Sequence, residues 1–435
     1  MKRRMLPVGL SVAWTLALNL GLAGFALGEQ DVAPKIDTGD TAWIIMSSAL
    51  VLCMTLPGLA LFYGGLVRSK NVLGTIMHSA VILCVISLVW ILLGYSLAFG
   101  PDKGGIIGGL EWVGLQGVGL EPSTTYATTI PHQVFMVFQM MFAAITVALI
   151  TGSIAERMKF KALLLFAVLW SLLIYSPLAH WVWGGGWLAQ LGALDFAGGA
   201  VVHISSGFGA LVCAIMVGKR KGFGAEPMPP HNLPMTVLGT GLLWFGWFGF
   251  NAGSALGANG VAAAAFVATH TAAAAGGLSW MAAEWVHRGK PTVLGILSGM
   301  IAGLATVTPG AGFLGPISAM LIGFLAGTLC YLAVVWKMRF GYDDSLDVVG
   351  IHGVGGFTGI LATGLFASIG AQGLFFGNPG LFGIQVVLAL VTLAFSVVGT
   401  FVILKIVDLT VGLRVTPQEE EIGLDLSQHS ERGYS

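Results

Sequence analysis

Two histidines, His203 and His352, lie inside stretches apolar enough to span a membrane, and similar segments lead into both. The first reads Asp195-Phe-Ala-Gly-Gly-Ala-Val-Val-His203, and the second reads Asp347-Val-Val-Gly-Ile-His352. An ionisable side chain at the depth of a bilayer is costly, so it marks a candidate functional site. Two such residues in matching halves of one chain predict a pathway built around an internal repeat.

The chemistry open to this pair is the passage of a small polar molecule or the relay of a proton. A neutral imidazole carries one donor and one acceptor nitrogen, so two facing rings can share a hydrogen bond beside a channel. Burial disfavours the charged form, and we expect both rings to be mostly neutral at pH 7. The alternative is an interhelical hydrogen bond that only holds the bundle together. The symmetry of the pair favours function, whereas the isolated His78, His180 and His270 carry little functional weight.

Aromatic residues near these segments could bind a cation. Phe138 and Phe142 are one helical turn apart. Trp183 follows one apolar run, and Ser254 ends another. Aromatic faces with one hydroxyl can hold a small cation by cation–π attraction, worth about 2 kcal/mol where water is excluded. The alternative is the belt of aromatic residues found at membrane interfaces, and both interpretations stay open for Phe142, Trp183 and Ser254.

Asp195 and Asp347 stand where the two histidine-bearing helices are expected to begin. A carboxylate at a helix N-terminus accepts hydrogen bonds from unpaired backbone N–H groups and offsets the helix dipole. We assign this structural role to both residues. For Asp195 a direct contact with substrate also stays open, because it lies beside the aromatic residues on the same side of the membrane.

The composition places the chain in a membrane. Of 435 residues, 56% are hydrophobic and 9% are charged, whereas soluble domains carry roughly 25% charged residues. The net charge is zero and no long basic run is present, so nucleic acid is not an expected partner. The cysteines lack metal-type spacing, and no nucleotide-binding or zinc-ligand motif occurs. We expect a membrane transporter or channel rather than an enzyme, with no metal and no cofactor.

Eleven apolar runs are long enough to cross a lipid bilayer, which needs about 20 residues per helix. They predict an all-α polytopic membrane protein with spans at about 42–66, 73–99, 132–153, 162–180, 198–218, 235–255, 260–285, 292–308, 314–336, 349–369 and 383–409. Within a transmembrane domain of residues 29–410, two five-helix repeats (about 42–218 and 235–370) would precede a final helix (about 383–409). An odd number of helices per repeat forces the repeats into inverted orientations, as in many transporters.

The charges of the loops predict the orientation. Only Lys35 and Lys103 lie on one side. Fifteen cationic residues lie on the other: Arg68, Lys70, Arg157, Lys159, Lys161, Lys219, Arg220, Lys221, Arg288, Lys290, Lys337, Arg339, Lys405, Arg414 and Arg432. The positive-inside rule predicts a protein of the cell (inner) membrane with a cytoplasmic tail at residues 411–435. Residues 1–28 read as a signal peptide, with a retained anchor as the alternative; either choice starts residue 29 outside.

Several segments of the chain resemble landmarks of the ammonium transporter family (Amt/Mep/Rh), specifically its bacterial Amt branch, over residues 40–431. They are Pro57-Gly-Leu-Ala-Leu-Phe-Tyr-Gly-Gly65, Phe138-Gln-Met-Met-Phe142, Ala155-Glu-Arg157, Trp183-Gly-Gly-Gly186, Gly192-Ala-Leu-Asp195-Phe-Ala-Gly-Gly199, Gly246-Trp-Phe-Gly-Phe-Asn-Ala-Gly-Ser254 and Asp347-Val-Val-Gly-Ile-His352-Gly353. Together these segments are highly specific, although no single one is. The resemblance implies a homotrimer with one pore per subunit.

By position, the resemblance also assigns an outer ammonium site. Phe142, Trp183 and Ser254 match the residues that form this site in the family, and Asp195 matches the aspartate that supports it. Retention of Trp183 and Phe142 is typical of the Amt branch rather than the Rh branch.

The resemblance assigns a gate and a pore below that site. Phe142 and Phe250 match the stacked rings of the gate, with Phe138 as their neighbour. His203 and His352 match the twin histidines that line the pore, and neither is replaced by an acidic residue as in some members.

The segment Glu421-Ile-Gly-Leu-Asp425-Leu-Ser-Gln-His429-Ser430-Glu431 resembles the family's cytoplasmic regulatory tail. In related bacterial proteins this region couples subunits and cooperates in docking of PII-type nitrogen-signalling proteins, so a PII-type partner is a hypothesis here. Ser430 stands where glycine is common, which is a departure from the family pattern.

The expected function is ammonium transport. Moving a bare ion into hydrocarbon costs on the order of 20 kcal/mol, whereas removing a proton costs about 3 kcal/mol when the pKa lies roughly two units above ambient pH. We expect ammonium to be captured outside, deprotonated, and passed as ammonia through the pore. An ammonium sensor that signals through the tail and a gas channel closer to Rh proteins are the alternatives. Whether the proton also crosses, and whether methylammonium is a substrate, stay open.

Overall fold

The computed structural model describes residues 34–434, so the expected signal peptide at residues 1–28 lies outside the described residues. Within residues 34–434, eleven helical segments are long and apolar enough to span a membrane: Thr38–Leu66, Ser69–Phe99, His132–Ile154, Phe160–Gln190, Gly199–Val217, Leu233–Gly253, Gly260–Arg288, Val293–Gly310, Pro316–Phe340, Val349–Phe366 and Pro379–Val411. The prediction of an all-α polytopic protein with eleven spans is confirmed.

Several spans consist of shorter helices joined at π-helical or 3-10 turns. The first five spans contain α2 (Thr38–Cys53), η2 (Met54–Leu59) and α3 (Ala60–Leu66); η3 (Ser69–Asn71), α4 (Val72–Val89), η4 (Trp90–Gly94) and α5 (Tyr95–Phe99); α6 (His132–Ile154); α7 (Phe160–Trp170), η6 (Ser171–Tyr175), α8 (Ser176–Val182) and α9 (Trp187–Gln190); and η7 (Gly199–Ile204) with α10 (Ser205–Val217). The others contain α11 (Leu233–Gly253); α12 (Gly260–Arg288); α13 (Val293–Val307) with η8 (Thr308–Gly310); α14 (Pro316–Phe340); η9 (Val349–Gly353) with α15 (Val354–Phe366); and α16 (Pro379–Val411). A π-helical turn often accompanies a functional site, and η7 and η9 contain the two histidines.

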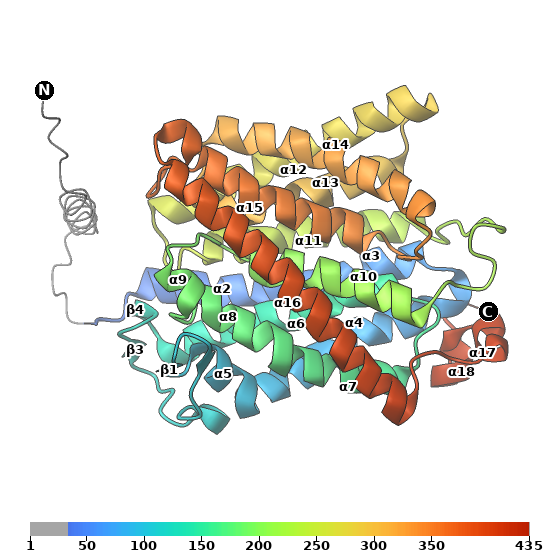
Figure 1. The fold of residues 1–435 in the computed structure, drawn as a ribbon, viewed down its shortest axis with the longest axis horizontal. Coiled ribbons are helices and arrows are strands. Elements are labelled where there is room, and N and C mark those ends of the chain that lie inside the picture. Colours follow the sequence, from blue (N-terminus) through green and yellow to red (C-terminus); the bar gives the residue numbers. More distant parts are fainter. Residues whose placement is uncertain (1–33, 435) are drawn as a thin grey trace, which may run out of the picture.

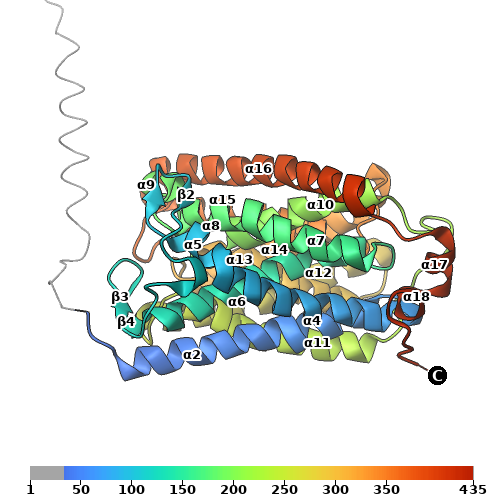
Figure 2. The same cartoon turned by 90° about the horizontal axis from the view of Figure 1, so that it is seen from below.

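The spans lie side by side along the long axis of the molecule (Figure 1). In the second view, α16 covers one face of the bundle, and α2 and α11 lie on the opposite face (Figure 2). The helix α6 is buried along nearly its whole length. Because α6 carries Phe138 and Phe142, these two rings lie inside the bundle rather than at its lipid-facing surface.

Glycines allow α12, α13 and α14 to approach one another closely. A Cβ atom at Gly276 would lie 2.5 Å from the carbonyl oxygen of Gly299, and a Cβ at Gly327 would meet the carbonyl oxygen of Gly276. Real side chains do not tolerate such contacts, so these positions require glycine. Small residues at helix interfaces are the usual basis of close packing in membranes, where no hydrophobic effect drives helices together.

The two helices that carry the histidines cross in opposite directions. A Cβ at Gly207 would meet the backbone of Gly353, and a Cβ at Gly356 would lie 2.7 Å from the Cβ of His203. Thus the first helix advances from 203 to 207 while its partner runs back from 356 to 353. Both helices open with a π-helical turn, η7 or η9, which supports the expected inverted relation of spans 5 and 10.

Irregular segments gather at the two ends of the bundle. One end, called the strand end below, carries η5 (Val113–Leu115), η10 (Leu374–Phe376) and two short hairpins. The hairpins pair β1 (Asp102–Lys103) with β2 (Ile107–Gly108), and β3 (Pro122–Ser123) with β4 (Ala127–Pro131). The other end, called the tail end, carries α17 (Pro417–Ile422) and α18 (Leu424–His429) (Figure 2).

The C-terminal tail folds back on the bundle at the tail end. Asp425 accepts a hydrogen bond from the backbone N–H of Gly74 at 2.7 Å, and the side-chain oxygen of Asn71 accepts one from the N–H of Leu424 at 2.8 Å. Ser430 ends α18 with φ +57°, in the left-handed region that favours glycine. This backbone geometry explains why glycine suits that position, which serine occupies here.

Candidate functional site

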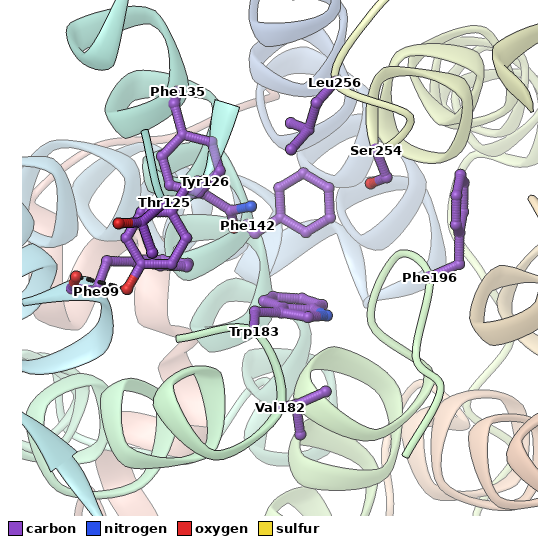
Figure 3. Close-up of a pocket in the computed structure, with 11 residues that line it drawn as sticks. Phe99, Thr125, Tyr126, Phe135, Phe142, Val182, Trp183, Phe196, Ser254 and Leu256 are labelled. Atoms are coloured by element: carbon purple, nitrogen blue, oxygen red, sulfur yellow. Dashed lines mark hydrogen bonds between the residues drawn. The ribbon is translucent and has the colours of Figure 1, made fainter. Parts of the chain in front are cut away.

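A cavity of about 310 Å³ opens at the strand end (Figure 3). Phe142, Trp183 and Ser254 all line it, although they come from α6, the turn after α8 and the end of α11. The full lining is Phe99, Thr125, Tyr126, Phe135, Gln139, Phe142, Val182, Trp183, Phe196, Ser254 and Leu256. We call this space the aromatic cavity.

The ring of Phe142 joins the aromatic cavity to the interior of the bundle. It meets Trp183 edge to face, with ring centroids 5.9 Å apart and an interplanar angle of 89°. It also stacks on Phe250, with centroids 4.1 Å apart and an angle of 17°. Phe138 contacts Phe142 at a centroid distance of 5.0 Å. Phe142 and Phe250 are both buried, so together they close the inner wall of the cavity.

Ser254 offers an oxygen to the aromatic cavity. Its hydroxyl donates to the carbonyl oxygen of Phe250 at 2.9 Å, a bond one helical turn back along α11. The hydroxyl proton is therefore engaged within the helix, while the oxygen keeps lone pairs that can accept. In Figure 3, Ser254 and Trp183 lie on different sides of the Phe142 ring. A small donor placed among these three side chains would meet π-faces and one acceptor.

Asp195 does not line the cavity, and its carboxylate binds backbone instead. Its two oxygens accept N–H groups of four residues at distances of 2.6–3.1 Å: Gly198, Gly199, Ala200 and Val201. These are the unpaired donors at the start of η7. Burial raises the pKa of Asp195, and the four N–H donors act in the opposite direction. The backbone carbonyl of Asp195 accepts from Nε1 of Trp183 at 2.7 Å, so the residue holds Trp183 in place.

The expected helix-capping role of Asp347 is wrong. Its carboxylate forms an ion pair with Lys337 on α14. Asp344, three residues earlier, accepts the backbone N–H of Val349 at 2.7 Å and so serves the start of η9. Burial raises the pKa of Asp344 to about 6.

Asp344 is the true counterpart of Asp195. It precedes His352 by eight residues, and Asp195 precedes His203 by eight residues. Asp347 precedes His352 by only five residues. The similar sequences before the two histidines therefore pair Asp195 with the wrong carboxylate. The two halves of the chain therefore use the same device, a buried carboxylate at the start of a π-helical turn that carries a histidine.

His203 and His352 lie in contact inside the bundle. Their Nδ1 atoms are 3.2 Å apart, and their ring centroids are 5.1 Å apart with an angle of 21° between the rings. Both side chains are buried. One Nδ1 must carry a proton and the other a lone pair for this hydrogen bond to form. The Nε2 atom of His203 has no hydrogen-bond partner within residues 34–434, so it keeps a free polar edge.

Contacts between rings connect the aromatic cavity to the histidines. Phe142 lines the cavity and stacks on Phe250, whose centroid lies 6.2 Å from the ring of His203. His203 in turn contacts His352. Trp247 stacks near His203 at 5.6 Å and flanks this line of residues. The order from the strand end inward is therefore cavity, stacked phenylalanines and paired histidines.

Other residues of the cavity were not expected from the sequence. Gln139 lies inside the Phe138–Phe142 segment, and its buried Oε1 has no hydrogen-bond partner in the described part of the chain. A polar residue one turn before Phe142 on an apolar helix is a signal that could have identified it. Tyr126 and Leu256 come from loops, where no helical periodicity indicates which way a side chain points.

The described residues 34–434 contain no group of three or more His, Cys, Asp or Glu side chains that could hold a metal ion. The fold and the site define a polytopic helical membrane protein with a buried line of aromatic rings and histidines. Comparison with known proteins is more specific. The sequence profile of the Ammonium Transporter Family matches residues 42–434.

Known ammonium transporters align with most of this chain. The ammonium transporter of Bacillus subtilis (strain 168) is 56% identical over 402 residues, covering 91% of this chain and 98% of that protein. The ammonium transporter Amt1 of Archaeoglobus fulgidus is 50% identical over 400 residues, covering 91% and 99%. The crystal structure of Saccharomyces cerevisiae Mep2 superposes with a TM-score of 0.83 at 38% identity, covering 88% of each chain. The chain belongs to the ammonium transporter family.

Proposed function

We propose that this protein captures ammonium in the aromatic cavity, removes one proton, and passes ammonia beside His203 and His352 across the membrane. The proposal depends most on the position of Phe142, which lines the cavity and also stacks on Phe250. A cation held in the cavity would therefore touch the same ring that leads toward the histidines. Membership of the family supports ammonium as the substrate and transport as the activity.

Capture would combine two kinds of contact. The faces of Phe142 and Trp183 attract a small cation with about 2 kcal/mol each where water is excluded. The oxygen of Ser254, whose proton is engaged by the Phe250 carbonyl, accepts one N–H of ammonium. Hydrated sodium is too large and too strongly solvated to exchange its water for these rings. Asp195 supports the site indirectly, by holding Trp183 and the start of η7.

Proton loss would occur at the stacked rings. Beyond Phe142 and Phe250 the path is apolar and buried, and an ion there has an idealised desolvation cost on the order of 20 kcal/mol. Deprotonating ammonium about two units below its pKa costs only about 3 kcal/mol. Potassium resembles ammonium in size but has no proton to lose. The need for deprotonation would therefore reject potassium where size does not.

The paired histidines would carry ammonia through the middle of the membrane. Ammonia donates and accepts hydrogen bonds, and the free Nε2 edge of His203 gives it a polar partner within an apolar wall. The hydrogen bond between the two Nδ1 atoms fixes both rings without a permanent charge. The same bond could also relay the released proton, in which case transport would carry net charge.

We also propose how the protein sits in its membrane and assembles. The strand end would face outward and the tail end the cytoplasm, because the fifteen cationic residues predicted on the inner side include Arg68, Lys70 and Arg414 near the tail. The expected assembly is a homotrimer in the cell (inner) membrane. The ordered tail, which contacts α4 through Asp425, would offer a docking surface for a PII-type partner.

An ammonium sensor is the second candidate. A structure described as a sensor Amt protein superposes with a TM-score of 0.84 at 31% identity, covering 90% of this chain and 98% of that one. In a sensor the same cavity would bind ammonium, and the output would be a tail-dependent signal. Ligand-dependent partner binding without measurable flux would favour this function over transport.

The experiment that tests the proposal uses purified protein in liposomes that contain a pH-sensitive dye. Ammonia that enters takes up a proton, so an inward ammonium gradient should alkalinise the interior faster than in empty liposomes. The rate should saturate with ammonium. Trp183→Leu should raise the half-saturating concentration about thirtyfold, because one cation–π contact of about 2 kcal/mol is lost and each 1.4 kcal/mol is about a factor of ten. Alkalinisation no faster than in empty liposomes, together with the absence of an ammonium-dependent current, would overturn the transport proposal and favour the sensor.

A further inference from the structure

His180 lies three residues before Trp183 and is fully buried at the strand end. Its Nδ1 lies 3.0 Å from the carbonyl oxygen of Ala98, and its Nε2 lies 2.8 Å from Oδ1 of Asp102. A carbonyl oxygen only accepts hydrogen bonds, and so does an ionised carboxylate. Both ring nitrogens of His180 must therefore donate. Only the doubly protonated imidazolium can do so.

The partner carboxylate is ionised under ordinary conditions. Asp102 belongs to β1, and 37% of its side chain is exposed. Its hydrogen bond with His180, followed by the N–H of Gly105, lowers the pKa of Asp102 below its ordinary value. At neutral pH the carboxylate thus carries no proton that it could donate to His180. The hydrogen-bond pattern then leaves the second proton on the ring.

Other titratable groups nearby do not replace this pair. Lys103 on the same hairpin forms its own exposed ion pair with Glu111 at 2.6 Å. Burial raises the pKa of Tyr126 to about 12, so this residue stays neutral, and it donates to the carbonyl of Phe99 at 2.7 Å. Among the ion pairs within residues 34–434, His180 takes part in one, with Asp102.

The backbone of His180 closes the turn that carries Trp183. Its carbonyl oxygen accepts the N–H of Gly184 at 3.0 Å and the N–H of Gly186 at 2.9 Å. A Cβ at Gly184 would lie 2.7 Å from Nδ1 of His180 and would also meet the carbonyl oxygen of Ala98. The turn is therefore pressed against the same atoms that the imidazole binds. A shift of the ring would move the turn, and Trp183 with it.

We propose that His180 is a positively charged positioning residue that ties the end of α5 and the hairpin β1–β2 to the turn bearing Trp183. It holds the indole against Phe142, with ring centroids 5.9 Å apart and an interplanar angle of 89°. This inference rests on the proposed capture role of the aromatic cavity. Asp102 neutralises the charge locally, so the imidazolium stiffens the cavity wall without repelling a cation.

The ion pair between His180 and Asp102 depends on pH. Because the pKa of Asp102 is lowered, the tie to its carboxylate is lost only as the outer pH falls through that depressed value. Affinity for ammonium should therefore hold across the neutral range and weaken at acidic pH, with maximal flux less affected.

Flux in liposomes tests the positioning role. His180→Gln keeps most of the side-chain volume but cannot donate to Ala98 and Asp102 together, so the half-saturating ammonium concentration should rise about fivefold with maximal rate and melting temperature nearly unchanged. Lys103→Gln removes the neighbouring exposed ion pair and should leave all three values unchanged. An unchanged half-saturating concentration in His180→Gln, or a fall confined to maximal rate, would overturn the proposal.

The Trp183→Leu variant separates this inference from the function on which it rests. If Trp183→Leu raises the half-saturating ammonium concentration and His180→Gln does not, only the positioning role fails. If neither variant does, the capture role of the cavity fails too.

Nitrogen NMR of histidine-labelled protein tests the charge directly, with His180→Gln used to assign the signal. Two protonated ring nitrogens at pH 7 are expected, reverting to one in Asp102→Asn, whose amide can donate to Nε2. One unprotonated nitrogen in the wild-type ring would overturn the imidazolium assignment.

Discussion

His203 and His352 face each other with their Nδ1 atoms 3.2 Å apart, although 149 residues separate them in the chain. Each ring sits in a π-helical turn that begins at a buried carboxylate, Asp195 in one half and Asp344 in the other. The two helices cross in opposite directions, so the rings approach each other from opposite ends of the bundle. In the path that we propose, this arrangement provides a central polar pair that needs no fixed charge.

Replacing His352 with alanine should lower ammonium flux about fivefold. The change removes one of the two polar rings beside the proposed path, so passing ammonia loses a hydrogen-bond partner worth about 1 kcal/mol, and each 1.4 kcal/mol is about a factor of ten. Flux is measured in liposomes, and folding by melting temperature. His270 lies tilted against Trp244, with ring centroids 5.2 Å apart, outside the proposed path. His270→Ala is therefore the matched control and should keep wild-type flux. Wild-type flux and selectivity in His352→Ala would refute a transport role for the pair.

Asp195→Asn should destabilise the protein far more than Asp347→Asn. The amide cannot accept all four backbone N–H groups at the start of η7, and each one left unpaired costs about 1–3 kcal/mol. Asp347 is partly exposed and forms one ion pair, which is worth about 1 kcal/mol or less. Melting temperatures of the two variants in detergent check this difference. Equal effects would show that the carboxylate of Asp195 is not a structural cap.

Asp344 should make stability depend on pH in the mildly acidic range. In the folded chain its pKa is raised to about 6, so the folded state holds a proton that the unfolded chain has already released. The contribution is present below about pH 4 and is lost as pH rises through about 6. Asp344→Asn keeps a neutral acceptor for Val349 and removes this dependence. The wild-type melting temperature, relative to that of the variant, should therefore fall between about pH 4 and pH 6.5. A rise over that range would contradict the burial argument.

Deleting residues 416–435 should abolish binding of a PII-type protein while leaving the spans folded. The tail contacts α4 through Asp425 and η3 through Leu424, but the aromatic cavity and histidines lie on other elements. Pulldown with purified PII-type protein, beside flux and melting measurements, checks this. Asp425→Asn weakens the packing of α18 on α4 without removing the tail, so it should reduce binding of the PII-type protein less than the deletion does. Undiminished pulldown by the deletion would exclude the tail as the docking surface.

Much of the fold could be predicted from the sequence because each span is a long apolar run. The bilayer allows only fully hydrogen-bonded helices or closed barrels, so length and hydropathy locate the spans. The approach of His203 to His352 was also expected, since a repeat with an odd number of helices must be inverted. The similarity of the neighbouring residues pairs Asp347 with Asp195, whereas equal spacing to the histidines identifies Asp344.

The cavity was less predictable for physical reasons. Tyr126 and Leu256 lie in loops, where the direction of a side chain depends on tertiary contacts and cannot be predicted from helical or strand periodicity. The sequence alone favours a structural role for His180, because an isolated histidine near a membrane face is usually structural. Its two acceptor partners, Ala98 and Asp102, come from another span and a hairpin, so only the folded structure brings them together.

The central claim is that the substrate loses a proton in order to pass, and comparison of ammonium with potassium tests it most directly. Protein in liposomes is given equal inward gradients of either ion, and current and internal pH are recorded together. If passage requires proton loss, ammonium should give a saturable alkalinisation when the proton stays outside, or a saturable current when the proton follows. Potassium should give no response above that of empty liposomes. A potassium current comparable to the ammonium signal would contradict it, because an ion without a proton would then be crossing the same path.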